Sequence, residues 1–163
     1  MIPNLRRFTV DDWQVYKSIR IEALEADGHF FGARIAIESA LTDEQWRERL
    51  ANEKVAIWGL YDEELCIGLT GVMEMREDTQ GALFIASYIR KEYRGKGFSA
   101  LYYQARLDWA RSMGYKFAEV HHRRDNLASK TANQRFGFIY THTENVPWPD
   151  GTQDDSLHYR LEL

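Results

Sequence analysis

The turn Arg94–Ser99, with the sequence RGKGFS, has the residue types best suited in this chain to bind an anion. Arg94 and Lys96 alternate with Gly95 and Gly97, and an amphipathic segment begins directly after the turn. Glycines let backbone N–H groups approach a ligand closely, and the first turn of a helix has N–H groups without partners. The turn can therefore hold phosphate oxygens. Glycine spacing alone is equally compatible with a solvated turn that starts a helix.

The spacing of this turn excludes two familiar phosphate-binding loops. A Walker-type loop needs four residues between its first glycine and a Gly-Lys-Ser/Thr sequence, and RGKGFS does not have that spacing. A dinucleotide-binding fingerprint needs a third glycine and an early βαβ position, whereas this chain continues with Phe98-Ser99-Ala100 past its middle. What remains is a general anion site formed by a glycine turn and a helix N-terminus.

Two further positions are candidates for acid–base chemistry. His121 lies in a predicted strand, and the ordinary pKa of histidine, about 6.5, suits removal of a proton from an amine. Its neighbour His122 must point to the opposite face of that strand, so the pair cannot bind one metal ion. Glu74, near the end of the predicted strand 65–75, is the alternative base. For each of these residues an ordinary structural position in a strand is the competing interpretation.

Hydrophobic periodicity and turn residues predict the elements that position these side chains. The predicted order is β-α-α-β-β-β-α-β-α-β-β, which indicates an α+β or α/β domain around one mixed, mostly antiparallel sheet. Strands are predicted at 3–9, 54–61, 65–75, 82–90, 115–122, 138–145 and 156–163, and helices at about 11–26, 43–52, 98–113 and 126–136.

Composition limits the classes of function. The chain has 163 residues, 44% of them hydrophobic and 28% charged, which fits one globular domain. The net charge of −4 argues against a general nucleic-acid binder and leaves a cationic small molecule or basic peptide as partner. A single cysteine, Cys66, fits a reducing compartment, and with no spaced histidine pair it predicts no metal site. No segment resembles a membrane helix or a signal peptide, so a cytoplasmic protein without membrane contact is expected.

Two segments, in this order, resemble the signatures of the GNAT N-acetyltransferase superfamily. The first signature is Arg or Gln, two residues, Gly, one residue, then Gly or Ala; Arg94 and Gly97 match it, and Ser99 departs from it. The second is an Asn at the end of the fifth strand, then a helix and Gly-Phe, which Asn126 and Gly137-Phe138 match. Two signatures in order are more specific than either alone, and the resemblance covers nearly the whole chain.

The resemblance implies the acyl-CoA N-acyltransferase fold in one domain over residues 1–163. This fold is a three-layer α+β arrangement, with a mixed, mostly antiparallel sheet of about seven strands, helices on both faces, and strands four and five splayed apart. It also implies acetyl-CoA as cofactor, with the pantetheine arm between the splayed strands and the pyrophosphate over the glycine turn. Asn126 is implied as a partner of a pantetheine amide, and a plain helix N-cap is its alternative role. The implied cofactor-binding residues are Tyr88, Ile89, Arg94, Gly95, Lys96, Gly97, Phe98, Ser99 and Asn126.

The implied reaction is direct transfer of acetyl to a primary amine of a small molecule or a peptide N-terminus. His121 stands at a position similar to that of a catalytic histidine in some relatives, with Glu74 as its rival. The usual acid is a tyrosine seven residues after the motif asparagine, and here that position is Asn133. An amide can hydrogen-bond the sulfur but cannot give up a proton at neutral pH. Tyr103, Tyr140 or a water are the substitutes.

The resemblance places the acceptor between the loops 27–41 and 145–155. The second loop contains an aromatic ring and carboxylates that could meet a cationic amine, namely Trp148, Asp150, Asp154 and Asp155. Phe30 and Phe31 in the first loop favour the core. The departure at Asn133 keeps a non-catalytic acyl-CoA-binding domain as the alternative function, and a homodimer is compatible with the resemblance.

Overall fold

One mixed sheet organises the protein. The computed structural model describes residues 2–163, and its seven strands form a single sheet. The short helix α2 (Ile35–Glu38) forms in the loop 27–41, for which no helix was predicted. None of the helices within these residues is long and apolar enough to span a membrane. The elements are β1 (Asn4–Arg7), η1 (Val10–Asp12), α1 (Trp13–Asp27), η2 (Gly28–Phe30), α2 (Ile35–Glu38), α3 (Asp43–Ala51), β2 (Val55–Asp62), β3 (Leu65–Glu74), β4 (Gly81–Ile89), η3 (Lys91–Tyr93), α4 (Ser99–Ser112), β5 (Phe117–Arg123), α5 (Leu127–Arg135), β6 (Ile139–Pro147) and β7 (Gln153–Glu162).

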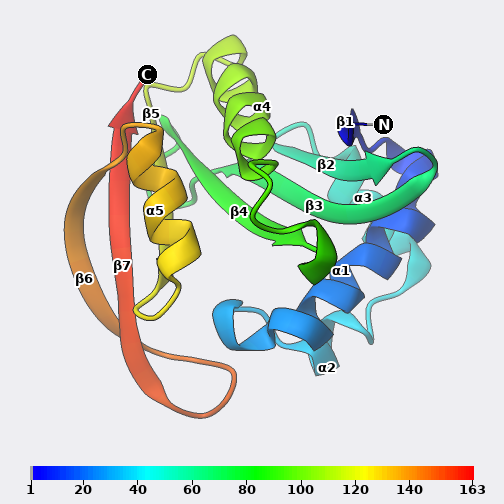
Figure 1. Ribbon diagram of the computed structural model, residues 1–163, viewed down its shortest axis with the longest axis horizontal. Helices are drawn as coiled ribbons and strands as arrows, with labels where there is room; N and C mark the ends of the chain where they lie inside the picture. The colour runs from blue at the N-terminus through cyan, green and yellow to red at the C-terminus, as the bar shows by residue number, and fades with distance from the viewer. Residues whose placement is uncertain (1) are drawn as a thin grey trace.

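The strand order confirms the predicted fold class. The sheet runs β1-β2-β3-β4-β5-β7-β6, and every neighbouring pair is antiparallel except β4 and β5. In Figure 1, β4 and β5 start side by side near the end of α4 and diverge as they run toward α1 and α2. The divergence divides the sheet into an N-terminal half and a C-terminal half.

Separate hydrophobic clusters pack on the two faces of the sheet. Helices α1 and α3 bring Tyr16 and Trp46 against Ile57 of β2 on one face. On the other face, the cluster of α4 includes Leu107 and Phe138, together with buried residues of β4, β5 and β7. Helices α1, α3 and α4 bury apolar side chains against the sheet, as the hydrophobic periodicity predicts. The cofactor predicted for this fold must therefore enter where no helix covers the sheet.

A β-bulge explains why β4 leaves β5. The parallel pairing of the two strands ends at Leu83↔Glu119, after only three residue pairs. Beyond this point, Ile85–Tyr88 of β4 faces Leu69–Gly71 of β3, so β4 contains one extra residue. Ala86, inside this segment, has a φ of 63°, an uncommon conformation for a residue with a side chain. Because a bulge bends its strand and increases the local twist, β4 turns away from β5 here.

A buried ion cluster orders the segment that joins α1 to α3. Glu38 of α2 accepts hydrogen bonds from Nε and Nη2 of Arg20, both at 3.0 Å, and from Arg49 at 2.9 Å. The two guanidinium groups hold the pKa of Glu38 below its ordinary value, although burial alone would raise it. The cluster thus fixes α2 between α1 and α3. The loop before α2, which contains Phe30 and Phe31, is held beside the sheet as a result.

Candidate functional site

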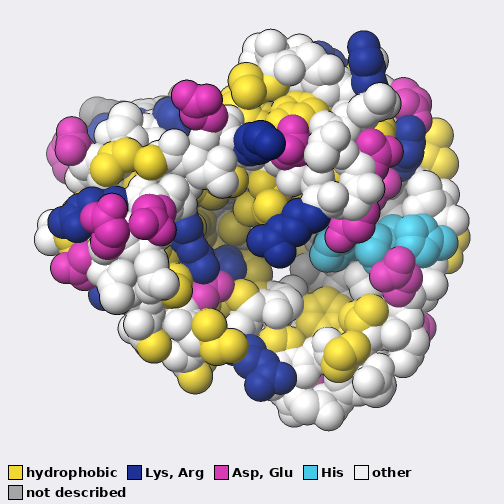
Figure 2. All heavy atoms as spheres, turned by 180° about the vertical axis from the view of Figure 1, so that it is seen from behind, with side chains coloured by type: hydrophobic (Ala, Val, Ile, Leu, Met, Phe, Trp, Pro, Cys, Tyr) yellow, Lys and Arg dark blue, Asp and Glu magenta, His cyan; other side chains and the backbone are white. Residues whose placement is uncertain are grey.

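The divergence of β4 and β5 opens a cavity of about 1160 Å³. Figure 2, which views the molecule from behind, shows a hollow at the centre of this face. The cavity is bounded by β4, β5, the starts of α4 and α5, the loop after α1, and the cleft side of β6 and β7. Its volume is large for a pocket that holds one small ligand. It has room for an extended cofactor arm and an acceptor together.

The glycine turn lies at one end of this cavity with its backbone N–H groups available. Gly95 and Gly97 have φ values of 74° and 85°, a conformation that glycine adopts without strain. Within residues 2–163, the N–H groups from Gly95 to Ser99 donate no hydrogen bond, and Ala100 N–H is the next to donate. All residues of the turn except Lys96 line the cavity, and the Lys96 ammonium lies over the Tyr93 ring. This geometry is that of an anion-binding turn at a helix N-terminus.

The Arg94 side chain connects the turn to β4 and α1. Its Nε donates to the Ile89 carbonyl at 2.6 Å, and its Nη2 donates to Asp27 at 2.8 Å. The neighbouring Tyr88 carbonyl accepts a hydrogen bond from Tyr102 Oη at 2.7 Å. The carbonyls of the two β4 residues predicted to pair with pantetheine therefore already have partners. Since a carbonyl oxygen can accept a second hydrogen bond, this pairing stays a prediction.

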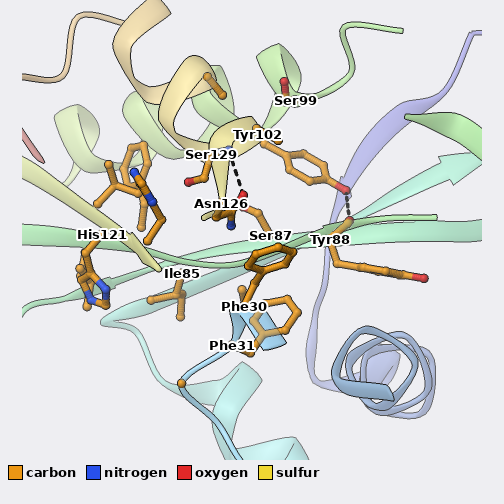
Figure 3. A pocket seen from close by; sticks show the side chains of 18 of the residues that line it. Phe30, Phe31, Ile85, Ser87, Tyr88, Ser99, Tyr102, His121, Asn126 and Ser129 are labelled. Atoms are coloured by element: carbon orange, nitrogen blue, oxygen red, sulfur yellow. Dashed lines mark hydrogen bonds between the residues drawn. The ribbon is translucent and has the colours of Figure 1, made fainter. Parts of the chain in front are cut away.

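Asn126 forms the N-cap of α5 and also lines the cavity. Its Oδ1 accepts a hydrogen bond from Ser129 N–H at 3.2 Å, which confirms the capping role. Its Nδ2 donates to no other group of the described chain, and Figure 3 shows the residue beside the cavity with Ser129. Capping uses the oxygen of the amide and leaves the nitrogen free. The two predicted roles of Asn126 are therefore compatible.

His121 faces the cavity from β5, as the prediction of a base requires. Its ring is open to solvent in the cleft, yet protein atoms around it desolvate the charged form and lower its pKa. It stacks on His158 of β7, with ring centroids 4.8 Å apart. His122 is buried instead, and its ring nitrogens contact the Arg123 carbonyl and Tyr159 Oη. A neutral His121 can accept a proton at neutral pH.

Acidic side chains that sequence reasoning missed line the cavity near His121. They are Glu77, Glu119 of β5 and Glu144 of β6. Burial raises the pKa of Glu119, while the nearby Arg160 charge opposes this effect. The alternation of β5 could have placed Glu119 on the same face as His121, since they are two residues apart. The sequence alone did not show that this face borders the cleft.

Glu74 and Asn133 lie outside the cavity. Glu74, at the end of β3, accepts a hydrogen bond from Tyr115 Oη at 3.2 Å and forms an ion pair with Lys54 at 3.3 Å. Asn133 is fully buried, and neither atom of its amide has a hydrogen-bond partner within residues 2–163. These positions argue against Glu74 as the base and against contact between Asn133 and the thioester sulfur.

The other polar side chains considered as substitutes for the missing tyrosine differ in their position relative to the cavity. Tyr103 lines the cavity, and burial raises its pKa, so its phenol keeps its proton. Tyr140 is half-exposed on β6, bonds to Thr143, and is not part of the lining. Ser129 lines the cavity at the start of α5. Of the two tyrosines considered as substitutes, only Tyr103 is in place.

A buried arginine faces the same region of the cavity. Arg106 of α4 donates from Nε to the Tyr102 carbonyl at 3.1 Å and from Nη1 to Ser87 Oγ at 3.0 Å. Its guanidinium also lies over the rings of Phe84 and Tyr103, and no carboxylate of the described chain pairs with it. Burial lowers its pKa to about 10, so it stays charged at neutral pH. The sequence analysis predicted this helix from the spacing of its apolar residues and did not single out Arg106.

The carboxylates of the loop 145–155 do not line the cavity. Asp150 and Asp154 pair with buried Arg123 at 2.8 and 3.0 Å, and neither lines the cavity. Asp155 accepts from Asn145 at 3.1 Å. Asp150 and Asp154 are thus already paired with a cation, and these positions argue against a direct role for them in binding a cationic amine.

The apolar residues of the same loops do reach the cavity. Trp148 lines it, with Arg123 over its ring at 4.8 Å. Phe30 and Phe31 also line it, although the sequence favoured a place in the core, and Figure 3 shows them on the side of the cavity opposite Asn126. Arg123 additionally donates to the His29 carbonyl at 3.0 Å and so joins the two loops.

Comparison with known proteins gives the family. The family described as "Acetyltransferase (GNAT) domain" matches residues 4–139. The chain belongs to this family, which confirms the resemblance. No curated protein sequence gives a significant match.

Several solved structures share the fold. A GNAT-family acetyltransferase from Streptococcus pneumoniae superposes with a TM-score of 0.82 at 15% identity, over 99% of this chain and 100% of that one. YncA from Salmonella typhimurium, a putative acetyltransferase solved with its cofactor acetyl-CoA, gives 0.82 at 15% identity over 100% and 95%. RimL, a ribosomal L7/L12 alpha-N-protein acetyltransferase in complex with coenzyme A, gives 0.78 at 13% identity over 99% and 94%.

The glycine turn supplies the first test. Replacing Gly97 by Ala should weaken CoA binding at least about tenfold, because a side chain at this positive φ costs about 1–2 kcal/mol and shifts the N–H groups. Isothermal titration calorimetry measures this affinity. Gly114→Ala is a matched control, since Gly114 has a φ of 82°, has equal space around its Cβ position, and lies outside the cavity. Equal CoA affinity in the two variants would refute the phosphate-binding role of the turn.

Proposed function

We propose that this protein is an acetyl-CoA-dependent N-acetyltransferase that transfers acetyl directly to a primary amine of a small molecule or a peptide N-terminus. The observation that supports it most is the cleft between β4 and β5, with the glycine turn at one end and His121 at the other. The turn would hold the pyrophosphate of the cofactor. The thioester would then lie between β4 and β5, near Ser87 and Ser129.

In this reaction the amine nitrogen attacks the thioester carbonyl carbon, the new C–N bond forms, and the C–S bond breaks. The attacking amine must first lose the proton of its ammonium form. His121, whose pKa is lowered by desolvation in the cleft, accepts this proton, directly or through one water. Unpaired backbone groups of β4 are the candidate donors to the developing oxyanion.

The leaving thiolate would be stabilised by hydrogen bonding rather than by full proton transfer. A free thiol has a pKa of about 8.5, whereas the pKa of buried Tyr103 is raised above that of an ordinary phenol. Its O–H is therefore a donor that keeps its own proton. The Arg106 guanidinium, which lies over the Tyr103 ring, supplies a positive charge on the same side of the cleft. Together these groups can take the role of the tyrosine that is replaced here by Asn133.

The acceptor would approach from the side bounded by Phe30, Phe31 and Trp148. This side combines aromatic rings with the carboxylates Glu77 and Glu119, all within the cavity lining. Aromatic faces and carboxylates attract an ammonium group. A cationic amine with an apolar body therefore fits this end of the cavity better than an anionic acceptor does.

Thiol release tests the proposed activity. The protein, incubated with acetyl-CoA and a panel of primary amines and peptides, should release free CoA thiol with at least one amine above the rate of spontaneous hydrolysis. A thiol-reactive dye measures the release, and mass spectrometry of the amine checks that it gains one acetyl group. CoA binding without thiol release on any amine would favour a non-catalytic acyl-CoA-binding domain.

The base is tested by His121→Ala. Loss of the proton acceptor should lower kcat about a hundredfold or more, while CoA affinity stays unchanged because the ring is remote from the glycine turn. Steady-state kinetics and calorimetry measure the two quantities on the same preparation. A near-normal kcat would assign proton removal to Glu119 or to bulk water.

The thiolate donor is tested by a pair of phenylalanine substitutions. Tyr103→Phe should lower kcat about ten- to a hundredfold, the value of one hydrogen bond to a charged group. The Phe136 ring that stacks on Tyr103 at 4.8 Å keeps its partner, so the fold should persist. Tyr140→Phe removes the other candidate hydroxyl, which lies outside the cavity, and should leave kcat unchanged. Equal rates for the two variants would exclude Tyr103 as the donor.

A further inference from the structure

Three potential metal ligands converge on one face of the C-terminal strands. His142 and Glu144 are two residues apart on β6, so their side chains point to the same face. His158 of β7 is the direct cross-strand partner of His142. All three side chains line the acceptor end of the cavity. In Figure 2, histidine side chains gather beside the central hollow with an acidic side chain next to them.

The distances between these side chains are short enough for one ion. Nε2 of His142 lies 2.9 Å from Oε1 of Glu144, and Nε2 of His158 lies 3.6 Å from Oε2 of Glu144. One ligand atom from each of the three residues lies within 4.8 Å of the other two. Ligands of a tetrahedral zinc ion, each about 2.0–2.2 Å from the metal, lie about 3.3–3.5 Å apart. Small side-chain rotations are sufficient to bring the three atoms to this spacing.

The state of His158 indicates that a partner is missing. Its Nε2 is buried and has no hydrogen-bond partner within residues 2–163. An imidazole with an unused ring nitrogen can bind a metal ion. An ordinary ion pair of His142 with Glu144 explains those two residues but not the buried nitrogen of His158.

We propose that His142, Glu144 and His158 bind one divalent transition-metal ion of the zinc class. Two imidazole nitrogens and one carboxylate oxygen suit Zn²⁺ and Co²⁺ better than Ca²⁺ or Mg²⁺, which prefer oxygen ligands. Three protein ligands would leave one position of a tetrahedral ion open, and all three side chains line the cavity. A donor atom of the acceptor or a water can occupy that position. The sequence-based expectation of no metal site rested on the single cysteine and on the lack of a spaced histidine pair, and it did not foresee that His142 and His158 are cross-strand partners.

Calorimetry on the full chain tests the site without any assay of acetyl transfer. The purified protein is treated with EDTA, dialysed, and titrated with ZnCl₂, and one Zn²⁺ per chain is expected. Glu144→Gln, which keeps the size of the side chain, and His158→Gln should each weaken binding at least about tenfold. His29→Gln is the matched control, because His29 is an exposed histidine away from the three ligands, and it should bind as the unchanged protein does.

Titration with CoCl₂ gives an independent readout. The visible absorption of bound Co²⁺ should show the intense bands of a tetrahedral site, and Zn²⁺ should abolish them by competition. Thermal unfolding of each variant checks that it is folded. If His158→Gln does not fold, Glu144→Gln and His142→Gln, whose parent side chains are about half-exposed, test the same ligands. Absence of saturable Zn²⁺ binding, or equal loss in His29→Gln and Glu144→Gln, would overturn the proposal.

Discussion

The early end of the β4–β5 pairing is the constraint on which the rest of the structure depends. Only three residue pairs join these parallel strands, and the bulge around Ala86 then turns β4 away. Beyond Leu83, the β4 edge that faced β5 has no strand to pair with. Buried backbone groups without partners are costly, so such an edge is stable only where water or a ligand can bond to it. The cavity beside β4 is the structural result of this interruption.

The same interruption separates the two halves of the sheet, and side-chain contacts connect the loops of the two halves. Arg123 at the end of β5 bonds to Asp150 and Asp154 of the C-terminal loop and to the His29 carbonyl after α1. Its side chain is almost fully buried, so these bonds to charged groups are stronger than they would be in water. Arg123 thus joins the loops around the acceptor end, together with His29, which contacts Asp125 at 2.8 Å and Asp150 at 3.9 Å. A change at Arg123 should alter the shape of this end without affecting the glycine turn.

The sequence predicted the fold well, and it predicted that the glycine turn and Asn126 would lie at the starts of two helices, because both features depend on local patterns. The glycine turn and the start of α4 are adjacent in the chain, and Asn126 caps the helix that directly follows it. The acceptor end could not be predicted in the same way. Whether Asp150 is free depends on Arg123, which lies on a different strand, and strand alternation does not say which face borders a cleft.

Helical periodicity had a similar limit for the residues near the expected sulfur position. The apolar spacing of α4 includes Tyr102 and Trp109, which are buried, but also Leu101 and Met113, which are exposed. It could not show that Tyr103 also points to the cavity, because a helix side facing a cleft and a side facing the core are both apolar. The departure at Asn133 was visible in the sequence. Tyr103 and Tyr140 were both named from the sequence as substitutes, but the sequence did not show that only Tyr103 lines the cavity.

The distribution of charge along the cavity is matched to the two substrates of an acetyl transfer. At the cofactor end are the glycine turn, the N-terminus of α4 and, further in, the buried cation Arg106. Burying a guanidinium without a carboxylate costs free energy, which two hydrogen bonds and two aromatic rings offset only in part. At the other end are Glu119 and Glu144. A cavity with separated charges of this kind attracts an anionic cofactor from one side and a cation from the other. The negative end does not distinguish an ammonium group from a metal ion by charge, and the two imidazoles beside Glu144 are the feature that favours the metal.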